Sequence, residues 1–355
     1  MTAILPETPR VLSLEYGALV STDAFVIGAG VIGLSTALRL AESGLRTTVY
    51  AAVPPHRTTS AAAGALWGPH LVGADDRVPE WAAQTLAHFR GLAADPATGV
   101  RDLTGIAAAP RRHESGPGES GGPADASEVP PFLRGAEGLS RCDPATLPGG
   151  FAVGWRYRAP VIAMPGYLDY LLERVLAAGG EVRLGPPLPS LAAAAENTTA
   201  PVLVNCAGIG ARDLVPDPDL EPVRGQVVVV ANPGLTEFFV GEGSGPDEVS
   251  YIFPHGATAV LGGTQRRGDA STEPDLVTAA RILAQCTAIE PRLAGAPVLA
   301  HRVGLRPVRP RVRLEAGTLA DGRAIVHNYG HGGAGVTLSW GCAATAASEV
   351  ARLLG

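Results

Sequence analysis

Lysine is absent from this chain of 355 residues, so arginine supplies every side chain that stays positively charged. The absence excludes mechanisms that need a side-chain amine, such as a pyridoxal Schiff base or the phosphate-binding lysine of a P-loop. The planar guanidinium of arginine suits carboxylates and phosphates, but the base composition of a genome can produce the same bias. We give that compositional explanation the larger weight.

Cysteine is also scarce, and the four cysteines are too widely spaced to form a C-x-x-C pair: Cys142, Cys206, Cys286 and Cys342. Neither a zinc site nor a disulfide framework is predicted, and we expect these residues to pack in the interior. No apolar run reaches the length of about 18 residues that a membrane span needs. The first residues lack the basic start and cleavage site of a secretory signal, so we expect a cytoplasmic protein.

Charge is limited too, because charged residues make up 17% of the chain and the formal net charge is -6. No strongly basic stretch offsets that charge, which argues against nucleic acid and anionic membranes as partners. The chain exceeds the size at which one hydrophobic core stops growing, so two domains are expected. A small-molecule enzyme fits these totals best.

The clearest local pattern is a strand, a glycine turn, a helix and a second strand. The strand is Ala24–Ile27, the turn Gly28–Gly33, the helix Val31–Ser43 and the second strand Arg46–Tyr50. This order within about thirty residues predicts a βαβ unit with parallel strands and a right-handed crossover.

A buried strand at Val202–Cys206 and a closing βα unit from Ala324 return the chain to the same sheet. We therefore predict an α/β fold in which a Rossmann-like domain, a parallel sheet with helices, is interleaved with an α+β domain on a mixed or antiparallel sheet. The expected dinucleotide-binding domain comprises residues 23–72, 155–215 and 296–355, and the substrate-binding domain residues 73–154 and 216–295. Residues 1–22 form an extension, and Arg111–Pro131 is a long surface loop. The other expected elements are helices at Gly166–Ala178, Ala279–Ile289 and Val336–Leu354, strands at Glu181–Leu184, Val227–Val230, Tyr251–Pro254, Ala259–Gly262 and Ala324–Val326, and a flexible segment at Gly241–Glu248.

The glycine turn, Gly28-Ala29-Gly30-Val31-Ile32-Gly33, matches the dinucleotide-binding fingerprint in both spacing and context. Gly28 permits the tight turn, Gly30 lets backbone N–H groups approach a pyrophosphate, and Gly33 lets helix and strand pack closely. The acidic residue that would bind the ribose is missing, because the second strand ends at Ala51 and Ala52. The sequence therefore does not identify which residue would bind the ribose.

Small hydroxyl residues follow in Arg57-Thr58-Thr59-Ser60, ahead of the run Ala61–Trp67. They could hydrogen-bond phosphate or ribose oxygens, or they could simply cap a helix, and the two interpretations are about equal. The small residues of the run, with Gly64, Ala65 and Leu66 at its centre, would let a large flat ring lie close to the backbone.

The segment Val303–Leu314 alternates in polarity if it is extended. Arg306, Val308, Val312 and Leu314 then face the apolar side, while Arg309, Arg311 and Arg313 face outward. An inward guanidinium needs an anionic partner, which could be a substrate carboxylate or a protein carboxylate. The pattern alone does not choose between them.

The segment His327–Thr337 is predicted to be a glycine-rich loop that leads from a strand into a helix. Its later part, Gly332, Gly333, Ala334, Gly335, Val336 and Thr337, places little side-chain bulk where a ligand would meet backbone. The positive end of the helix would stabilise negative charge on a reduced cofactor ring. A metal site at His327 and His331 is not expected, because their spacing converges only on a helix.

With these motifs the chain resembles the D-amino acid oxidase and D-aspartate oxidase family from about Asp23 onward. The fingerprint and Gly304–Pro307 are shared with wider amine-oxidising flavoproteins. More particular to the family are the His327–Gly335 segment, Arg224-Gly225-Gln226, Val204-Asn205-Cys206 and Ala63–Trp67. The resemblance implies noncovalent FAD bound by the glycine turn, Ala51, the Arg57–Ser60 and Gly64–Leu66 residues and Gly332–Thr337.

The resemblance also implies the reaction. Arg306 and the hydroxyl of Tyr251 would bind the substrate carboxylate, and the backbone carbonyl of Gly333 would hold the amine. Hydride transfer from the α carbon to flavin N5 would give an imino acid that hydrolyses to a 2-oxo acid and ammonia, and O2 would become hydrogen peroxide.

Some departures from the family bear on the substrate. Asp247 stands where some members carry a second tyrosine, and Gly68 and Ala334 replace larger residues, so a roomier pocket is expected. Gln265 replaces an arginine of the acidic-substrate branch, although His70 or Arg266 could still meet a side-chain carboxylate. We therefore expect neutral D-amino acids, with D-aspartate as the alternative. A glycine or sarcosine oxidase and a nicotinamide dehydrogenase are more distant alternatives, and a homodimer stays open.

Overall fold

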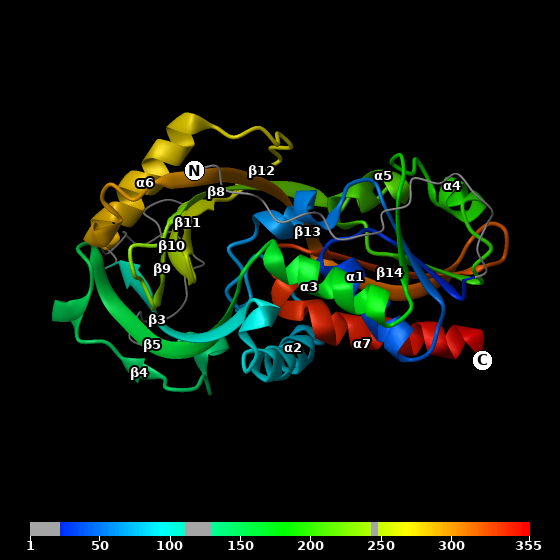
Figure 1. Cartoon of the computed structure of the whole chain (residues 1–355), viewed down its shortest axis with the longest axis horizontal. Helices are drawn as coiled ribbons and strands as arrows, with labels where there is room; N and C mark the ends of the chain where they lie inside the picture. Colours follow the sequence, from blue (N-terminus) through cyan, green and yellow to red (C-terminus); the bar gives the residue numbers. More distant parts are fainter. Residues whose placement is uncertain (1–21, 111–128, 243–247) are drawn as a thin grey trace, which may run out of the picture.

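The computed structural model describes residues 22–110, 129–242 and 248–355. Asp247, nearly all of the 1–22 extension and most of the 111–131 loop and of the 241–248 segment therefore lie outside the described residues. The described strands form one hydrogen-bonded sheet in the order β4-β5-β3-β9-β10-β11-β8-β13-β14-β7-β1-β2-β6, with β12 beside β8. The predicted α/β class is confirmed, but the two expected sheets are continuous with each other (Figure 1).

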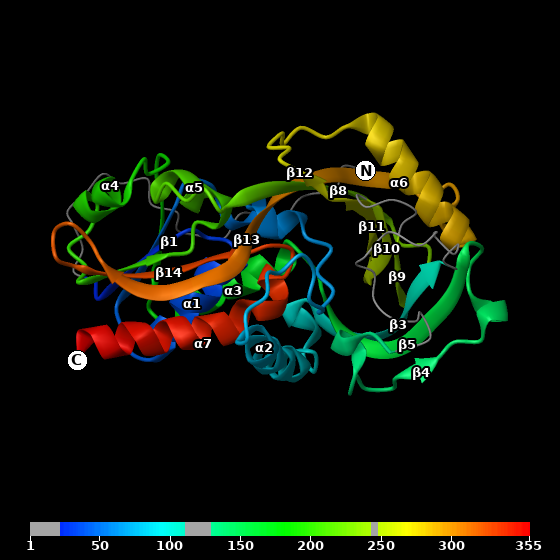
Figure 2. The same cartoon turned by 180° about the vertical axis from the view of Figure 1, so that it is seen from behind.

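The parallel half of the sheet contains the predicted βαβ unit. Its strands are β1 (Ala24–Ile27), β2 (Thr47–Ala51), β6 (Glu181–Leu184), β7 (Val202–Asn205) and β14 (Ala324–His331). Strand β1 lies between β2 and β7, with Ala24 opposite both Thr47 and Val202. The helices α1 (Val31–Glu42), α3 (Gly166–Ala177) and α7 (Gly335–Leu354) lie on one side and α4 (Leu191–Glu196) and α5 (Ala211–Leu214) on the other (Figures 1 and 2). Both faces are covered, which is why these strands are apolar throughout.

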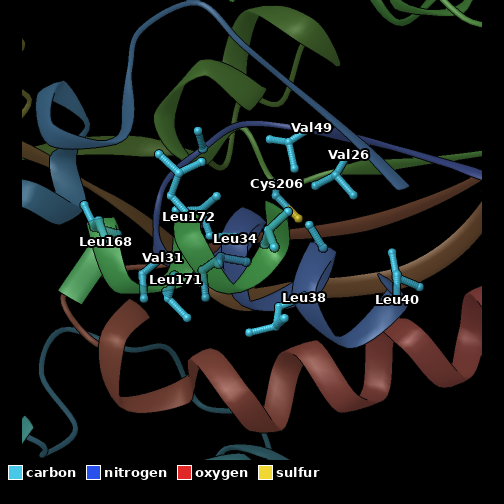
Figure 3. Packing of buried hydrophobic residues seen from close by; sticks show 14 of the residues in the cluster. Val26, Val31, Leu34, Leu38, Leu40, Val49, Leu168, Leu171, Leu172 and Cys206 are labelled. Carbon is cyan, nitrogen blue, oxygen red and sulfur yellow. The ribbon is translucent and has the colours of Figure 1, made fainter. Parts of the chain in front are cut away.

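Helix α1 is the centre of the main core. Leu34, Leu38 and Leu40 are at most 1% exposed and pack with residues of α3 and the sheet, including Leu171 and Val49 (Figure 3). Because α1 is apolar on nearly every side, it stays fixed between α3, α7 and the strands. Its N-terminus is thereby held at the end of β1.

The second half is a mostly antiparallel sheet, with one parallel pair between β3 and β9. Its strands are β3 (Val100–Pro110), β4 (Ser140–Arg141), β5 (Phe151–Ile162), β8 (Glu221–Ala231), β9 (Phe238–Glu242), β10 (Glu248–His255), β11 (Thr258–Thr264) and β12 (Arg266–Arg267). Helix α6 (Leu276–Ile289) buries Ile282 and Cys286 against this sheet, and α2 (Val78–Leu92) packs on α7. Short 3-10 helices complete the fold: η1 (Pro55–Arg57), η2 (Thr59–Ala62), η3 (Pro96–Thr98), η4 (Pro131–Leu133), η5 (Pro144–Thr146), η6 (Gly208–Gly210) and η7 (Pro291–Leu293).

Strand β13 (Val298–Thr318) joins the two halves, since it pairs with β8 at Val298–Val308 and with β14 at Val308–Thr318. The predicted alternation is confirmed in part: Val312 and Leu314 are 2% and 4% exposed, and Arg311 faces solvent. Arg309 and Arg313 were expected to face outward as well, but their side chains are only 19% and 26% exposed and both pair with the buried Asp217. A register shift between Val308 and Arg313 interrupts the pairing with β14, in the part of the segment that contains Pro310.

The prediction that His327–Thr337 is a loop is wrong for most of its length. Strand β14 continues to His331, a turn covers residues 332–334, and α7 begins at Gly335. Beyond His327, where the pairing with β7 ends, the segment stays extended because β13 pairs with it at Asn328, Tyr329 and His331. Gly332, with φ of 57°, makes the sharp turn, and a side chain there would collide with the carbonyl of Leu71.

Candidate active site

A cavity of about 1440 Å³ lies where the two halves of the sheet meet. One end is formed by the loops that follow β2, β6 and β7, the middle by the N-terminus of α1 and by η2, and the other end by β8, β10 and β13. All predicted site residues except Gly33 and Ala334 line it: Gly28, Gly30, Val31, Ile32, Ala51, Arg57, Thr58, Thr59, Ser60, Gly64, Ala65, Leu66, Tyr251, Arg306, Gly332, Gly333, Gly335, Val336 and Thr337. The cavity exceeds the usual volume of a drug-sized pocket and has room for a dinucleotide beside a small substrate.

The two exceptions are packing residues. A methyl group on Gly33 would lie 1.9 Å from the carbonyl oxygen of Gly28, so this glycine allows helix and strand to touch, as the fingerprint requires. Ala334 is fully buried against Trp81 and Leu338. Its small size therefore does not widen the cavity wall.

The hydroxyl residues of η2 lie beside the fingerprint rather than simply capping a helix. The backbone N–H of Val31 donates to Ser60 Oγ at 3.0 Å. Thr59 Oγ1 donates to the carbonyl of Leu305 at 3.3 Å, and Thr58 Oγ1 to that of Pro55 at 2.7 Å. These bonds tie η2 to α1 and β13, and they place hydroxyl groups at the positive end of α1.

Sequence reasoning missed the wall at the far end of the cavity. Pro187–Pro189 after β6 and the residues 207–210 after β7 line it, together with Asp213 of α5. The sequence could have predicted these residues, because they follow parallel strands and ligands of open α/β sheets bind beyond the carboxyl ends of such strands. Ala52 and Val53, where the fingerprint acid is missing, line the same end.

Arg306 lies at the opposite end. Its Nη1 donates to the carbonyl oxygen of Thr264 at 2.9 Å, and a further hydrogen bond joins it to Tyr251. Among residues 22–110, 129–242 and 248–355, no carboxylate forms an ion pair with it. Burial lowers the pKa of the guanidinium, and Tyr251 opposes that shift. Arg306 is therefore a buried cation that no carboxylate of the described residues pairs with.

Tyr251 is held rigidly beside this guanidinium. It is 9% exposed, and its ring stacks on Phe253 with 4.6 Å between centroids. Gly64, Gly262 and Gly263 surround the side chain so closely that a methyl group on any of them would lie within 3.0 Å of a Tyr251 atom. Burial raises the pKa of Tyr251, with Arg306 acting in the opposite direction. The hydroxyl therefore stays protonated and can donate.

His70 and Gly333 complete the wall near Arg306. A methyl group on Gly333 would lie 2.6 Å from Cδ2 of His70, so the two residues are in contact. Burial, assisted by the charge of Arg306, lowers the pKa of His70 to about 4, and the imidazole is neutral at pH 7. Arg266 does not line the cavity, because its guanidinium donates to Thr278 Oγ1 at 2.9 Å on the other side of β11.

The space beyond Arg306 and Tyr251 is walled mainly by apolar side chains. They come from β3, β5, β8, β9, β10 and η4: Ala107, Phe132, Tyr157, Val227, Val240, Val249 and Phe253. A ligand side chain in this space would meet few polar partners. The same cavity thus has a polar end suited to phosphates and ribose and, at the other end, a buried cation beside an apolar space.

These residues fit an FAD molecule. A methyl group on Gly30 would lie 3.1 Å from Ser60 Oγ, so glycine at this position lets the hydroxyl lie close to the N-terminus of α1, where a pyrophosphate would bind. Thr337 Oγ1 bonds the carbonyl of Gly68 at 2.9 Å, which fixes the first turn of α7 against the cavity. Within the described chain, no group of His, Cys, Asp and Glu side chains is arranged to hold a metal, and no helix is long and apolar enough to cross a membrane.

Comparison with known proteins agrees with this geometry. A sequence model of the FAD dependent oxidoreductase family matches residues 23–349. The chain is 50% identical to a D-amino-acid oxidase of Rubrobacter xylanophilus over 92% of this chain and 94% of the relative. It is 47% identical to one of Streptomyces coelicolor over 93% and 96%. A glycine oxidase from Geobacillus kaustophilus superposes with a TM-score of 0.75 at 19% identity, covering 93% of this chain and 95% of the other, and shows the fold alone.

Proposed function

The chain belongs to the FAD dependent oxidoreductase family and within it to the D-amino-acid oxidases, and on that premise we propose that it oxidises mainly neutral D-amino acids. The products are the 2-oxo acid, ammonia and hydrogen peroxide, with O2 and water consumed. FAD, when bound, supplies the acceptor for the two electrons and passes them to O2.

The observation that carries the proposal is the guanidinium of Arg306. It lines the cavity, it bonds a carbonyl and a tyrosine, and it has no ion pair with any described carboxylate. A buried cation without an anion is costly, and a bound carboxylate removes that cost. An α-amino acid carries such a carboxylate next to the carbon that is oxidised.

Three groups of this chain then fix the substrate. Arg306 and the protonated Tyr251 hydroxyl bind the carboxylate, and the carbonyl oxygen of Gly333 accepts a hydrogen bond from the amine. With acid and amine held, only one enantiomer directs its α C–H toward the cofactor while its side chain occupies the apolar space. Catalysis by the protein is then orientation and electrostatics, with no side-chain base required.

The residues that would hold FAD are those of the polar end. The N-terminus of α1 with Gly28 and Gly30 and the hydroxyl of Ser60 would meet the pyrophosphate. Gly64–Leu66 and Gly332–Thr337 would lie along the ring, with the start of α7 directed at it. These assignments rest on the cavity lining and on the glycine positions.

The apolar lining supports neutral substrates over acidic ones. A second carboxylate would need a cationic partner, yet Arg266 faces Thr278 and Asp275 instead of the cavity. His70 lines the cavity but is neutral at pH 7, because its pKa is about 4. D-aspartate is the alternative substrate, and its turnover would have to rely on His70 as a hydrogen-bond partner.

The purified protein provides the test. We expect it to be yellow and to release hydrogen peroxide with D-alanine and larger neutral D-amino acids, more slowly with D-aspartate, and not with L-alanine. Arg306→Ala should lower kcat/KM for D-alanine by roughly 1,000-fold, since truncating one partner of a buried charged pair costs several kcal/mol. A colourless protein that takes up no FAD, or an Arg306→Ala variant with unchanged kcat/KM, would contradict the proposal.

A further inference from the structure

The tripeptide Arg224-Gly225-Gln226 lies in the middle of β8, and the proposed reaction gives it no role. Side chains alternate along a strand, so the arginine and the glutamine face one side of the sheet and the glycine faces the other. Leu305 pairs with Arg224 and Gly304 with Gly225 on the neighbouring β13. Gly225 is therefore hydrogen-bonded into the sheet beside β13, two positions along from the pair formed by Val223 and Arg306.

On the cavity side, Gly225 is crossed by the side chain of Arg306. A methyl group on Gly225 would lie 2.4 Å from Nη1 and 2.6 Å from both Cζ and Nη2. Such distances are far below van der Waals contact, so any side chain at this position would displace the guanidinium. The backbone of Gly225 has no positive φ that would disfavour alanine. The requirement for glycine here is therefore one of space.

Thr264 connects the tripeptide to the guanidinium. The backbone N–H of Gln226 donates to Thr264 Oγ1 at 3.0 Å, and Arg306 Nη1 donates to the carbonyl oxygen of the same threonine at 2.9 Å. The end of β11 is thus anchored on β8 at the residue whose carbonyl receives Arg306. Arg306 reaches across β8 from β13 to β11.

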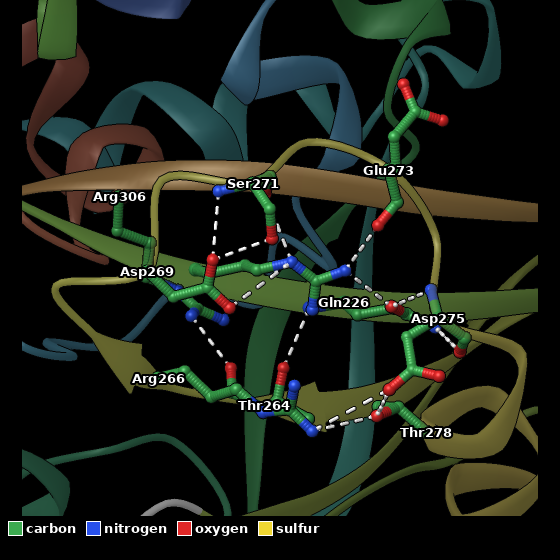
Figure 4. Close-up of polar contacts among 10 residues, drawn as sticks. Gln226, Thr264, Arg266, Asp269, Ser271, Glu273, Asp275, Thr278 and Arg306 are labelled. Carbon is green, nitrogen blue, oxygen red and sulfur yellow. Dashed lines mark hydrogen bonds and ion pairs between the residues drawn. The ribbon is translucent and has the colours of Figure 1, made fainter.

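On the opposite side, the other two side chains of the tripeptide hold the segment Ser271–Asp275 (Figure 4). Arg224 is 1% exposed and donates to the carbonyls of Ser271 at 3.1 Å and Glu273 at 2.6 Å. Gln226 accepts from the Asp275 N–H at 2.9 Å and donates to its carbonyl at 2.7 Å. These hydrogen bonds attach β8 to the segment Ser271–Asp275 on the face opposite Arg306, and they hold the strand in position next to the guanidinium.

We propose that Gly225 is a positioning residue for the substrate carboxylate. It leaves the space in which the Arg306 guanidinium lies across β8, while Arg224, Gln226 and Thr264 hold the strands on either side. This inference rests on the proposed function, because it assigns to Gly225 the placement of the group that binds the carboxylate. The inference predicts that a methyl group added at Gly225 impairs substrate binding only because it displaces the guanidinium of Arg306.

The first test is Gly225→Ala in the FAD-loaded enzyme. We expect kcat/KM for D-alanine to fall about 100-fold, mainly through KM, because a displacement of about 1 Å costs that much. Benzoate, used as a simple carboxylate ligand, should bind correspondingly more weakly when followed by calorimetry, while the Kd for FAD stays unchanged. Gly149→Ala is the matched control, since its exposed glycine has no neighbour within 4 Å of an added methyl group.

A double-mutant cycle separates positioning from a merely structural effect. In an Arg306→Ala background the added methyl meets no guanidinium, so Gly225→Ala should then change neither kcat/KM nor Tm further. If Gly225→Ala alone folds poorly, Arg306→Ala should restore its Tm. Additive losses in the cycle, or wild-type benzoate binding in Gly225→Ala, would overturn the inference. Failure of the wild-type enzyme to oxidise any D-amino acid would instead overturn the proposed function.

Discussion

Burial acts on the pKa of both side chains proposed to bind the carboxylate, yet one stays neutral and the other stays charged. Burial raises the pKa of Tyr251, so its hydroxyl keeps its proton at neutral pH, while Arg306 remains a cation even though burial lowers its pKa. The Tyr251 oxygen accepts from Arg306, which has only donors, and the hydroxyl proton of Tyr251 remains free to be donated to the same anion that Arg306 binds. The pair needs no further protein group to bind a carboxylate.

Replacing Tyr251 by phenylalanine isolates the contribution of the hydroxyl. The ring should stay in place against Phe253, so the free energy of unfolding should change little. Loss of one hydrogen bond to an anion costs about 1.5 kcal/mol, and KM for D-alanine should rise roughly 10-fold with a smaller change in kcat. Steady-state peroxide assays measure both constants. Tyr170→Phe, a change at the surface contact with Arg174, is the control; an unchanged KM in Tyr251→Phe would remove the hydroxyl from substrate binding.

At the scale of elements, the segment between β12 and α6 depends on one buried side chain. Arg224 donates to two carbonyls of this segment and to Gln226 Oε1, and its charge is 3.9 Å from Asp269. The N-terminus of α6 begins where the segment ends, at Asp275. The packing of α6 on β8 and β11 is therefore linked to this arginine.

Arg224→Met tests that dependence. Methionine fills similar volume but donates nothing, so the carbonyls of Ser271 and Glu273 lose the arginine as their partner. Gln226 Oε1 keeps only the N–H of Asp275. We expect the free energy of unfolding to fall by about 3 kcal/mol in urea titrations. Arg267→Met, in the adjacent strand β12, loses only an exposed ion pair with Glu221 and should change the free energy of unfolding by less than about 1 kcal/mol. Equal effects in the two variants would mean that burial of Arg224 contributes nothing.

The elements also show where sequence reasoning succeeds. The strands Ala24–Ile27 and Glu181–Leu184 and the helix over Gly166–Ala177 agree with their predicted bounds to within a residue, because each is short, periodic and bounded by glycine or a cap. Their local sequence and the tertiary structure favour the same conformation. The cavity lining of the glycine fingerprint was predictable for the same reason.

The failures arise where distant pairing overrides local preference. Glycines at 330 and 332 suggested a loop, yet pairing with β13 extends β14 to His331. Likewise, no periodicity shows that Arg306 crosses Gly225 to Thr264, because that contact joins three strands. Sequence alone identified Arg306 as the inward arginine, but it left open whether a protein or a substrate carboxylate is the partner.

At the scale of the whole molecule, the buried histidines link stability to pH. Burial lowers the pKa of His70, His255 and His327 to about 4 and that of His331 to about 3. His327 and His331 are the most buried, at 6% and 2% exposure. In the unfolded chain a histidine binds its proton near pH 6.5. Unfolding therefore takes up protons at any pH between these values.

The sign follows from linkage. Because the folded pKa is depressed, the stability contributed by each neutral histidine is fully present above about pH 6.5 and is lost as the pH falls toward 4. At pH 5 the loss is about 2 kcal/mol for each fully buried ring, so we expect the holoenzyme, at saturating FAD, to unfold at clearly lower urea concentration than at pH 7.5. The slope of unfolding free energy against pH measures the number of protons taken up on unfolding, and that number should fall by about one in His331→Asn. His56→Asn, a change at an exposed site, should leave the slope as it is in the wild type. Equal stability of the wild type at pH 5 and 7.5 would show that these imidazoles are protonated in the folded protein.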